Sequence, residues 1–553
     1  MSLPTAQRIS WTTIGWIILI LAIALSPNIY LFVHNLFILK LSYSIRILVR
    51  VLFAFNLAAI PLFIPGVNLK MYFYFLSLFV LLSPISFVTV ALYDFLPTKW
   101  MMLGILQTNG NEAMEFIRGM EWVVLLGALV FAGYIWLVHS KIPRHAEIPK
   151  RARQIFFAAT LGLILVVAGW TMSVYGAKDL PANLFTRVLA LSYPAGFLLN
   201  TAEAAAEIRG YGDASMANFS FHATDTDTVN ARKICVVILG ESSRYGNWSI
   251  NGYPRATSPL LSAEDNLVSF SDMISPAPLT GLSLPIILTR DTPEHPERSH
   301  TEKSILAAFR EAKYDTYWIA NQPAEPSTLR FTTDALSYTF IGKDRFDEEL
   351  VSHLQNVIDT TKGNLFVLLH TLGNHYNYAN RFPATYNRFT PSTFDQNTDS
   401  KRAADSVLIR NSYDNSVLYA DFVIHSVIET VRRAGAASTV TYVSDHGEML
   451  FDNGTDKLGH GIGVPSRYIH HIPFFIWFSD EYRSHFPERA SMTQSRKDAA
   501  VSTTNIFHSL AGFHGLKLDG LTSEHSILAP EFREQKRMVM AREGQLLDYD
   551  SIR

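Results

Sequence analysis

The amino-terminal third carries five long apolar stretches, and these constrain the fold more than any other feature of the 553-residue chain. They lie near residues 11–33, 47–66, 71–93, 121–139 and 155–175. A helix needs about 20 apolar residues to cross a bilayer, and each stretch is close to that length. Residues 1–176 are therefore predicted to form a membrane domain of five transmembrane helices.

The distribution of Lys and Arg predicts how this domain is oriented. The loop between the last two stretches is the most basic one, with Lys141, Arg144, Lys150, Arg151 and Arg153. Cytoplasmic loops of membrane proteins carry an excess of such residues, so this loop is expected inside the cell. Arg46 and Arg50 argue weakly for the opposite orientation. Everything after residue 176 would then lie outside the cytoplasm, which in a Gram-negative cell means the periplasm.

The second part of the chain reads differently, because short apolar runs alternate with amphipathic ones, as in βαβ units. Strands are predicted at 233–239, 315–320, 364–370, 438–443 and 472–477, and helices at 302–313 and 406–434. We expect a periplasmic catalytic α/β domain over residues 231–553, with a doubly wound, mostly parallel sheet. Residues 177–230 are expected to form an interfacial linker that contains a helix around 199–208.

Polar residues follow the ends of four predicted strands. Glu241 follows the first strand, Asn321 follows the second, and the third ends at His370. The fourth leads directly to Asp445 and His446. Because the carboxyl ends of parallel strands meet at one edge of a sheet, these side chains are expected to lie close together.

Glu241, Asp445 and His446 offer two carboxylates and one imidazole, a set that suits zinc better than manganese or magnesium. The alternative interpretation is a turn in which Asp445 caps a helix and His446 is solvated. Glu448 is interpreted as a helix cap. The single cysteine, Cys235, lies in an apolar run and is predicted to be buried, and no intramolecular disulfide or cysteine-based metal cluster can form.

A hydroxyl is the natural nucleophile beside such a metal, because coordination lowers its pKa. Four residues are contenders, and their spacing does not choose among them: Ser242, Ser243, Thr280 and Ser283. Three other histidines are expected to be structural or solvated: His353, His425 and His470.

Seven segments carry a family resemblance: 240–244 (GESSR), 251–259 (NGYPRATSP), 279–285 (LTGLSLP), 370–375 (HTLGNH), 413–421 (YDNSVLYAD), 444–448 (SDHGE) and 471–475 (HIPFF). Together they resemble the phosphoethanolamine transferases of Gram-negative envelopes, which belong to the alkaline-phosphatase/sulfatase superfamily. The resemblance implies a metal-dependent enzyme that is anchored in the inner membrane by several passes. Such an enzyme takes phosphoethanolamine from phosphatidylethanolamine and passes it to lipopolysaccharide, at lipid A or a core sugar, or to a related glycan.

The resemblance also implies roles for individual residues. The family nucleophile matches Thr280. The family zinc ligands match Glu241, Thr280, Asp445 and His446. Histidines that hold the phosphoryl group or a second metal match His375 and His460. Substrate-binding positions match Thr108, Glu112 and Asn321, the first two in a polar loop between predicted membrane spans.

The chain departs from the family pattern at several points. Members near the lipid A modifiers usually carry several disulfides, which a chain with one cysteine cannot form. A lysine that is common shortly after the position of Asn321 is missing, and Gly104 stands where an asparagine is common. Residues 519–530 look more like the branch that modifies the lipopolysaccharide core.

Other functions are possible for this architecture. A phosphoglycerol transferase that acts on a periplasmic glycan is the nearest alternative, and a catalytically inactive sensor or scaffold is another. A sulfatase is disfavoured because the sequence has no Cys-x-Pro-x-Arg or Ser-x-Pro-x-Arg motif. The net charge of -2 and the lack of a long basic run in the second half argue against nucleic-acid binding.

Overall fold

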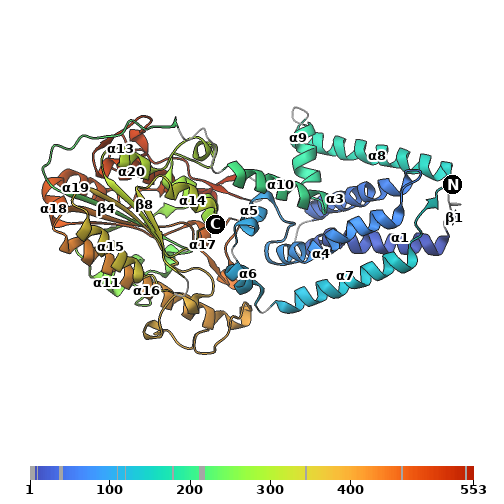
Figure 1. Ribbon diagram of the computed structural model, residues 1–553, viewed down its shortest axis with the longest axis horizontal. Coiled ribbons are helices and arrows are strands. Elements are labelled where there is room, and N and C mark those ends of the chain that lie inside the picture. The colour runs from blue at the N-terminus through green and yellow to red at the C-terminus, as the bar shows by residue number, and fades with distance from the viewer. Residues whose placement is uncertain are drawn as a thin grey trace. The chain divides into compact units, whose positions relative to one another are not determined.

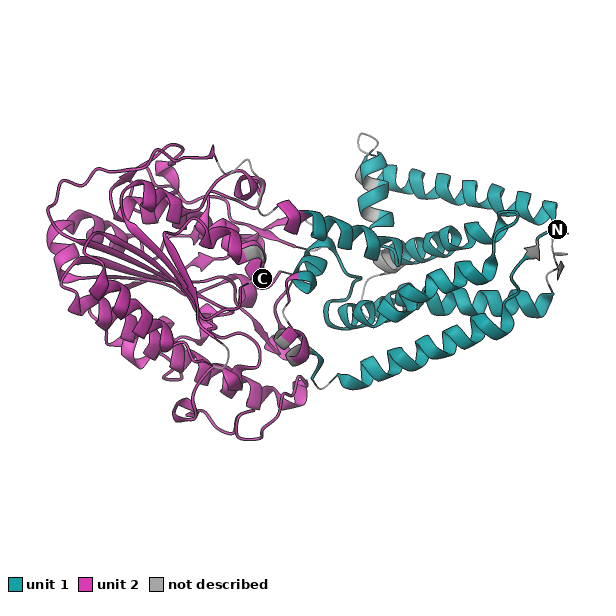
Figure 2. Ribbon diagram, viewed as in Figure 1, with its two compact units in different colours: residues 1–106, 116–206 teal, residues 107–115, 207–553 magenta. Residues whose placement is uncertain are grey.

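The apolar stretches fold into helices that form the first of two units in the chain (Figures 1 and 2). The structure is a computed structural model, and it describes residues 7–8, 10–36, 41–108, 110–118, 120–176, 180–210, 218–324, 326–342, 345–461, 465–541 and 545–552. The first unit comprises Met1–Leu106 and Phe116–Ala206, and the second comprises Gln107–Glu115 and Glu207–Arg553. The division of the chain into a membrane domain (1–176), an interfacial linker (177–230) and a catalytic domain (231–553) remains a prediction.

Four helical segments are long and apolar enough to cross a membrane: Ile45–Phe63, Leu69–Tyr93, Glu121–Lys141 and Lys150–Ser173. A fifth candidate is the pair α1 (Trp11–Ala24) and α2 (Ser26–Leu36), whose axes are bent by 68° at the break. Pro27 lies in the first turn of α2, where a proline is tolerated because its missing N–H has no helical acceptor. The stretch predicted as one helix over 11–33 is thus two helices.

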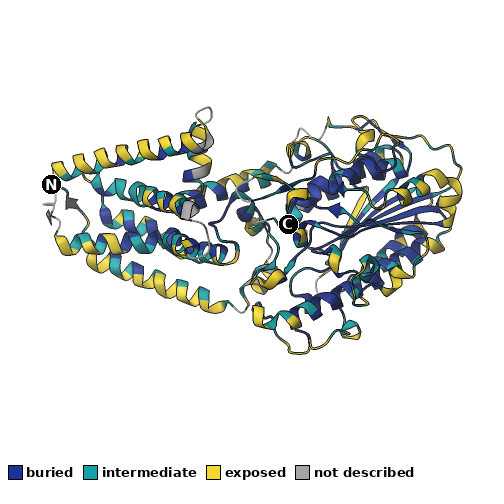
Figure 3. Cartoon of the chain, turned by 180° about the vertical axis from the view of Figure 1, so that it is seen from behind, coloured by how far each residue is buried: buried dark blue, intermediate teal, exposed yellow. Residues whose placement is uncertain are grey.

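The remaining helices of this part of the chain are α3 (Leu41–Ala59), α4 (Leu69–Tyr93), α5 (Lys99–Gln107), α6 (Gly110–Ile117), α7 (Glu121–Lys141), α8 (Lys150–Tyr175), α9 (Leu180–Leu184) and α10 (Ala195–Gly210). Many residues along α7 and α8 are exposed (Figure 3), and they include the large apolar residues Leu125, Leu129, Ile155 and Leu165. Water would not favour such faces, whereas the hydrocarbon of a bilayer does. α10 contains the helix expected around 199–208.

The second unit is built on a seven-stranded sheet in the order β5-β13-β10-β4-β9-β7-β8. Its strands are β4 (Lys233–Gly240), β5 (Leu267–Ser269), β7 (Asp315–Ala320), β8 (Ser337–Phe340), β9 (Leu365–His370), β10 (Ala437–Ser444) and β13 (Phe474–Phe478). β10, β4, β9, β7 and β8 are parallel, whereas β13 and β5 are antiparallel to their neighbours. The prediction of a mostly parallel sheet is confirmed. The edge strands β5 and β8 were not predicted, because each is too short to produce a clear pattern.

Helices cover both faces of this sheet, as a doubly wound fold requires (Figure 1). Alternate residues of β4 point to opposite faces: Cys235, Val237 and Leu239 enter one apolar core, and Ile234 and Val236 enter the other. The first core is closed by α12 (Thr280–Leu288), α13 (Ile305–Glu311) and α20 (Ile506–Phe513), and the second by α11 (Pro259–Ser262), α15 (Glu349–Thr360) and α16 (Ser406–Arg433). The predicted burial of Cys235 is confirmed.

The other elements of the unit are short. They include α14 (Pro326–Thr332), α17 (Arg467–His470), α18 (Asp480–His485) and α19 (Pro487–Ser495), and the two-stranded pairs β3 (Thr224–Asp225) with β15 (Leu516–Lys517), β6 (Met273–Ile274) with β14 (Val501–Ser502), β11 (Met449–Leu450) with β12 (Leu458–Gly459), and β16 (Met538–Met540) with β17 (Leu546–Asp548). The hairpin of β11 and β12 follows the segment 444–448 and leads toward His460, so it bears on the site.

Candidate active site

Polar residues gather at the carboxyl ends of the parallel strands, because β10, β4, β9 and β7 are neighbours in the sheet. Glu241 is the first residue after β4, and Asp445 and His446 follow β10 directly. Ser444 pairs with Gly240, so the two loops leave the sheet side by side. This edge is where ligands bind in open α/β sheets.

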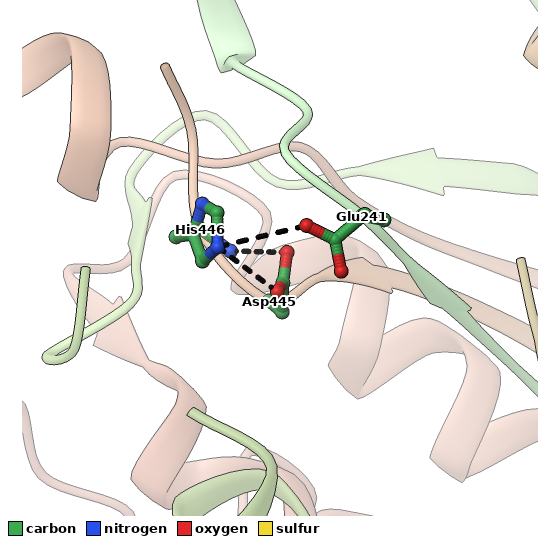
Figure 4. A group of neighbouring side chains, drawn as sticks. All are labelled: Glu241, Asp445 and His446. Carbon is green, nitrogen blue, oxygen red and sulfur yellow. Dashed lines mark hydrogen bonds and ion pairs between the residues drawn. The ribbon is translucent and has the colours of Figure 1, made fainter. Parts of the chain in front are cut away.

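Glu241, Asp445 and His446, called here the strand-end group, are buried and bring one ligand atom each to within 4.8 Å of the others (Figure 4). Nε2 of His446 lies 3.2 Å from Oδ2 of Asp445 and 3.7 Å from Oε1 of Glu241. Nδ1 of His446 donates to the carbonyl of Gly447 at 3.0 Å. That bond directs the Nε2 lone pair toward the carboxylates, the arrangement expected of a metal-binding histidine.

The two carboxylate oxygens of Asp445 have different partners. Oδ1 accepts hydrogen bonds from the backbone N–H groups of Ser242 at 2.9 Å and His446 at 2.7 Å. Oδ2 is buried, and it accepts no hydrogen bond from any residue that the structure describes. A buried acceptor without a donor is unfavourable, and a cation at this position would compensate it. The residues present therefore fit a divalent metal.

Burial shifts the pKa values of the strand-end group. It raises the pKa of Glu241 well above the ordinary value, and the neighbouring carboxylate of Asp445 raises it further. Burial also raises the pKa of Asp445 and lowers that of His446 well below its ordinary value. These shifts all disfavour the charged forms, and a bound cation would reverse them for the two carboxylates.

Thr280 begins α12 beside the strand-end group. Its Oγ1 donates to Oε2 of Glu241 at 3.1 Å and lies 3.4 Å from Nε2 of His446. Thr280 is half buried, whereas the three residues of the strand-end group are fully buried. The structure thus brings together Thr280 and the three residues that the sequence predicted as its neighbours.

The other three hydroxyls are placed less favourably. Ser242 is fully buried, and its Oγ donates to Oε1 of Glu241 at 2.8 Å. Oγ of Ser243 accepts from Nε1 of Trp248 at 2.9 Å, and Ser283 is fully buried with its hydroxyl turned to a backbone carbonyl. Geometry therefore favours Thr280, a choice that spacing alone could not make.

His460 and His375 lie beyond the strand-end group. The ring of His460 is 4.0 Å from that of His446 between centroids, and 6.4 Å from that of His375. Gly373 precedes His375 in a turn with a φ of +52°, and a side chain there would meet the backbone of Glu241 at 2.9 Å. This turn needs glycine for both reasons. Burial lowers the pKa of His375 well below its ordinary value, which favours the neutral imidazole.

Asn321 belongs to the network that holds this turn. Its Nδ2 donates to Oδ1 of Asp347 at 2.9 Å. The same carboxylate accepts from the backbone N–H groups of Leu372 and Gly373, both at 2.9 Å. Asp347 thereby links the end of β7 to the turn that carries His375.

Gln322 reaches the strand-end group, although the sequence indicated no role for it. Its Nε2 donates to the carbonyl of Thr371 at 3.0 Å and to Oε2 of Glu241 at 3.4 Å. Ala320, the last residue of β7, is buried in the first core. Gln322 lies two residues beyond it, so its position at the carboxyl end of a parallel strand is the signal that could have identified it.

Glu448 is not a helix cap, so that interpretation was wrong. β11 follows it directly, and its buried carboxylate contacts His460. Of the polar loop, Thr108 follows α5 and Glu112 lies on α6, and both belong to the second unit. The side chain of Glu112 lies outside the part of the chain that the structure describes.

A family model described as Sulfatase matches residues 233–516, which run from β4 to β15 and include the whole central sheet and the strand-end group. The chain therefore belongs to the sulfatase family. Within that family its relatives include "Phosphoethanolamine transferase EptC" of Escherichia coli (strain K12), which is 27% identical over 483 residues, 81% of this chain and 80% of that protein. The resemblance inferred from the motifs is confirmed by this match.

Two solved structures extend the comparison. The zinc complex of the C-terminal periplasmic domain of EptC from Escherichia coli matches 60% of this chain and 96% of that one, with 27% identity and a TM-score of 0.54. The integral membrane protein lipooligosaccharide phosphoethanolamine transferase A (EptA) from Neisseria meningitidis matches 94% of this chain and 98% of that one, at 22% identity and a TM-score of 0.74. The second match shows that the two parts of the fold occur together in another membrane protein.

Proposed function

We propose that this protein transfers phosphoethanolamine from phosphatidylethanolamine to lipopolysaccharide, at lipid A or at a core sugar, through a phosphothreonine at Thr280. One observation carries the proposal. The hydroxyl of Thr280 lies within hydrogen-bond distance of both a carboxylate and an imidazole of the buried strand-end group, and Thr280 itself is only half buried. The match to a phosphoethanolamine transferase over four-fifths of the chain supports the choice of substrate.

Zinc is the metal that we assign to Glu241, Asp445, His446 and Thr280. Oxygen and imidazole donors in a set of four suit zinc, and the zinc complex of the related periplasmic domain supports the assignment. When bound, zinc lowers the pKa of the hydroxyl and stabilises negative charge on the phosphoryl group.

The reaction consists of two displacements at phosphorus. In the first, Oγ1 of Thr280 loses its proton and bonds to phosphorus, while the bond to the diacylglycerol oxygen breaks and that oxygen gains a proton. In the second, an oxygen of the acceptor loses its proton and bonds to phosphorus, while the bond from phosphorus to Oγ1 of Thr280 breaks and Oγ1 regains a proton. His375 and His460 are assigned to these proton transfers, since a neutral imidazole accepts a proton and its cation returns one.

The proposed cellular location of the enzyme follows from its substrates. Both are membrane lipids in our proposal, so the apolar helices would anchor the enzyme in the inner membrane with the second unit in the periplasm. Thr108, Glu112 and Asn321 remain the predicted contacts to the lipid headgroup. Substitution of each by alanine should raise KM for the lipid more than it lowers kcat.

The proposal is tested by the intact mass of the full-length protein in detergent after incubation with phosphatidylethanolamine. A gain of one phosphoethanolamine unit on Thr280, lost after treatment with a zinc chelator and restored by zinc, is the expected result. The Thr280→Ala variant should gain nothing, and Ser283→Ala is the matched control that should react normally.

The contrary outcomes are equally specific. An adduct from phosphatidylglycerol but not from phosphatidylethanolamine would make the enzyme a phosphoglycerol transferase. Full transfer by the Thr280→Ala variant would rule out a phosphothreonine intermediate at Thr280. Absence of any adduct in a zinc-loaded, folded protein would favour a sensor or scaffold.

A further inference from the structure

Glu448 lies two residues beyond His446 and is completely buried. Both of its carboxylate oxygens are used by side chains from elsewhere in the fold. Oε1 accepts a hydrogen bond from Nδ1 of His460 at 3.1 Å, and Oε2 accepts one from the hydroxyl of Tyr378. Glu448 is not a member of the strand-end group, so its contacts serve another purpose.

Tyr378 is itself held in place. It is buried, and its ring packs edge-to-face on Tyr413 with centroids 5.1 Å apart. The hydroxyl of Tyr413 donates to the carbonyl of Ser242 at 2.8 Å and accepts from the N–H of Arg244 at 2.9 Å. The support of Glu448 is therefore tied to the loop that carries Glu241.

A carboxylate can only accept hydrogen bonds, and this decides the tautomer of His460. In the neutral ring, with Nδ1 facing Glu448, the proton sits on Nδ1 and Nε2 carries the lone pair. An amide at this position could instead turn its NH2 group toward Nδ1 and place the proton on Nε2. The charge and the acceptor-only chemistry of Glu448 thus matter beyond its shape.

We propose that Glu448, braced by Tyr378, is a positioning residue that fixes the orientation and tautomer of His460 for proton transfer. The inference rests on the proposed transferase function, and it adds a residue whose role acts wholly through His460. Partners that orient a metal-binding histidine commonly affect activity about 10–100-fold when removed, and we expect an effect of the same order for His460.

The experiment compares initial rates of phosphoethanolamine transfer by full-length protein in detergent. Glu448→Gln keeps the shape and should lower kcat about 10–100-fold, with KM and zinc content unchanged. Tyr378→Phe removes one hydrogen bond to Glu448 and should lower kcat about 2–10-fold. Glu311→Gln is the matched control: its carboxylate accepts hydrogen bonds from two backbone N–H groups, those of Phe221 and Ala223, and within the described part of the chain it contacts none of the site residues.

Two further measurements separate positioning from a structural role. In a protein that already carries His460→Ala, Glu448→Gln should cause no additional loss, because both changes remove the same contribution. Formate should restore part of the activity of Glu448→Ala but none of the activity of His460→Ala.

Several results would overturn the inference while leaving the transferase function intact. The first is a wild-type kcat in Glu448→Gln. The second is a rate in the double variant Glu448→Gln/His460→Ala that falls by the product of the two single losses. The third is loss of bound zinc from Glu448→Gln along with its activity. If Glu448→Gln does not fold, the test rests on Tyr378→Phe and on rescue of Glu448→Ala by formate. A wild-type rate in Tyr378→Phe together with no rescue of Glu448→Ala would refute the role. Absence of transfer by the wild-type protein would instead refute the proposed function.

Discussion

Two groups in the described part of the chain combine two carboxylates with one imidazole, and each brings its ligand atoms to within 4.8 Å of one another. The first is the strand-end group, formed by Glu241, Asp445 and His446. The second, called here the helix group, is formed by Glu264, His425 and Glu429. Glu264 follows α11, and its two partners lie on α16. Composition and distance alone would treat the two groups as equal.

They differ in how their negative charge is balanced. In the helix group, the guanidinium of Arg432 contacts both Glu264 and Glu429, and Nε1 of Trp477 donates to Glu264 at 3.2 Å. In the strand-end group, burial raises the pKa of both carboxylates, the charge of Asp445 raises that of Glu241 further, and Oδ2 of Asp445 lacks a donor among the described residues. Uncompensated, buried negative charge marks the group that fits a metal.

Matched substitutions of the two groups test this difference most strongly. Glu241→Gln should lose bound zinc and lower transfer by at least about 10³-fold, because it removes a proposed metal ligand and a partner of Thr280. Glu264→Gln should keep zinc content and rate close to wild type. Metal analysis of the purified variants and the transfer assay give both readouts. Equal loss of zinc in the two variants would contradict the comparison.

The sequence was sufficient for the four neighbouring parallel strands β10, β4, β9 and β7 and for the residues at their ends. β4 and β10 are continuous β-branched and apolar runs, and the parallel pairing of such strands forces Glu241 and Asp445 together whatever the loops do. The motif resemblance then pointed to Thr280 and His460. These are local patterns combined with one general rule of sheet topology.

The other contacts of the site join segments that are distant in the sequence, and such contacts cannot be predicted from a single sequence. Tyr378 and Glu448 are 70 positions apart, and Gln322 and Glu241 are 81 apart. Glu448 could be misread as a helix cap because a lone acidic residue after a turn is common. In the helix group, the pair Glu429 and Arg432 is readable at a spacing of three residues, but the approach of Glu264 is not.

The second test of the difference between the two groups is how the stabilisation of the protein by zinc depends on pH. In metal-free protein, Glu241 and Asp445 have raised pKa values, so the native state holds protons that the unfolded chain has released. Their contribution to stability is present below the ordinary carboxylate range and is lost as pH rises through the raised values. Each carboxylate can contribute up to about 1.4 kcal/mol per pH unit in that window.

The gain in Tm on adding zinc should therefore grow as pH rises above the ordinary carboxylate range, because the carboxylates lose their protons and would otherwise be charged without a partner. Differential scanning fluorimetry with and without zinc measures it. Asp445→Asn should flatten the dependence, while Glu264→Gln should leave it unchanged. A zinc effect that shrinks with rising pH would mean that the strand-end carboxylates are not the groups responsible.

The smallest expected effect on stability comes from removal of the Arg432 guanidinium, which contacts the helix group. Arg432→Met should change the free energy of unfolding by less than about 1 kcal/mol, because the Arg432 side chain is 42% exposed and surface ion pairs contribute little. It should nevertheless let the protein take up additional zinc weakly, since two carboxylates and His425 would then lack a cation. Equilibrium dialysis against zinc, with wild type as the control, measures that uptake. A second zinc bound by wild type but lost in Glu429→Gln would show instead that Arg432 does not exclude a metal, and compensation of charge would no longer distinguish the two groups.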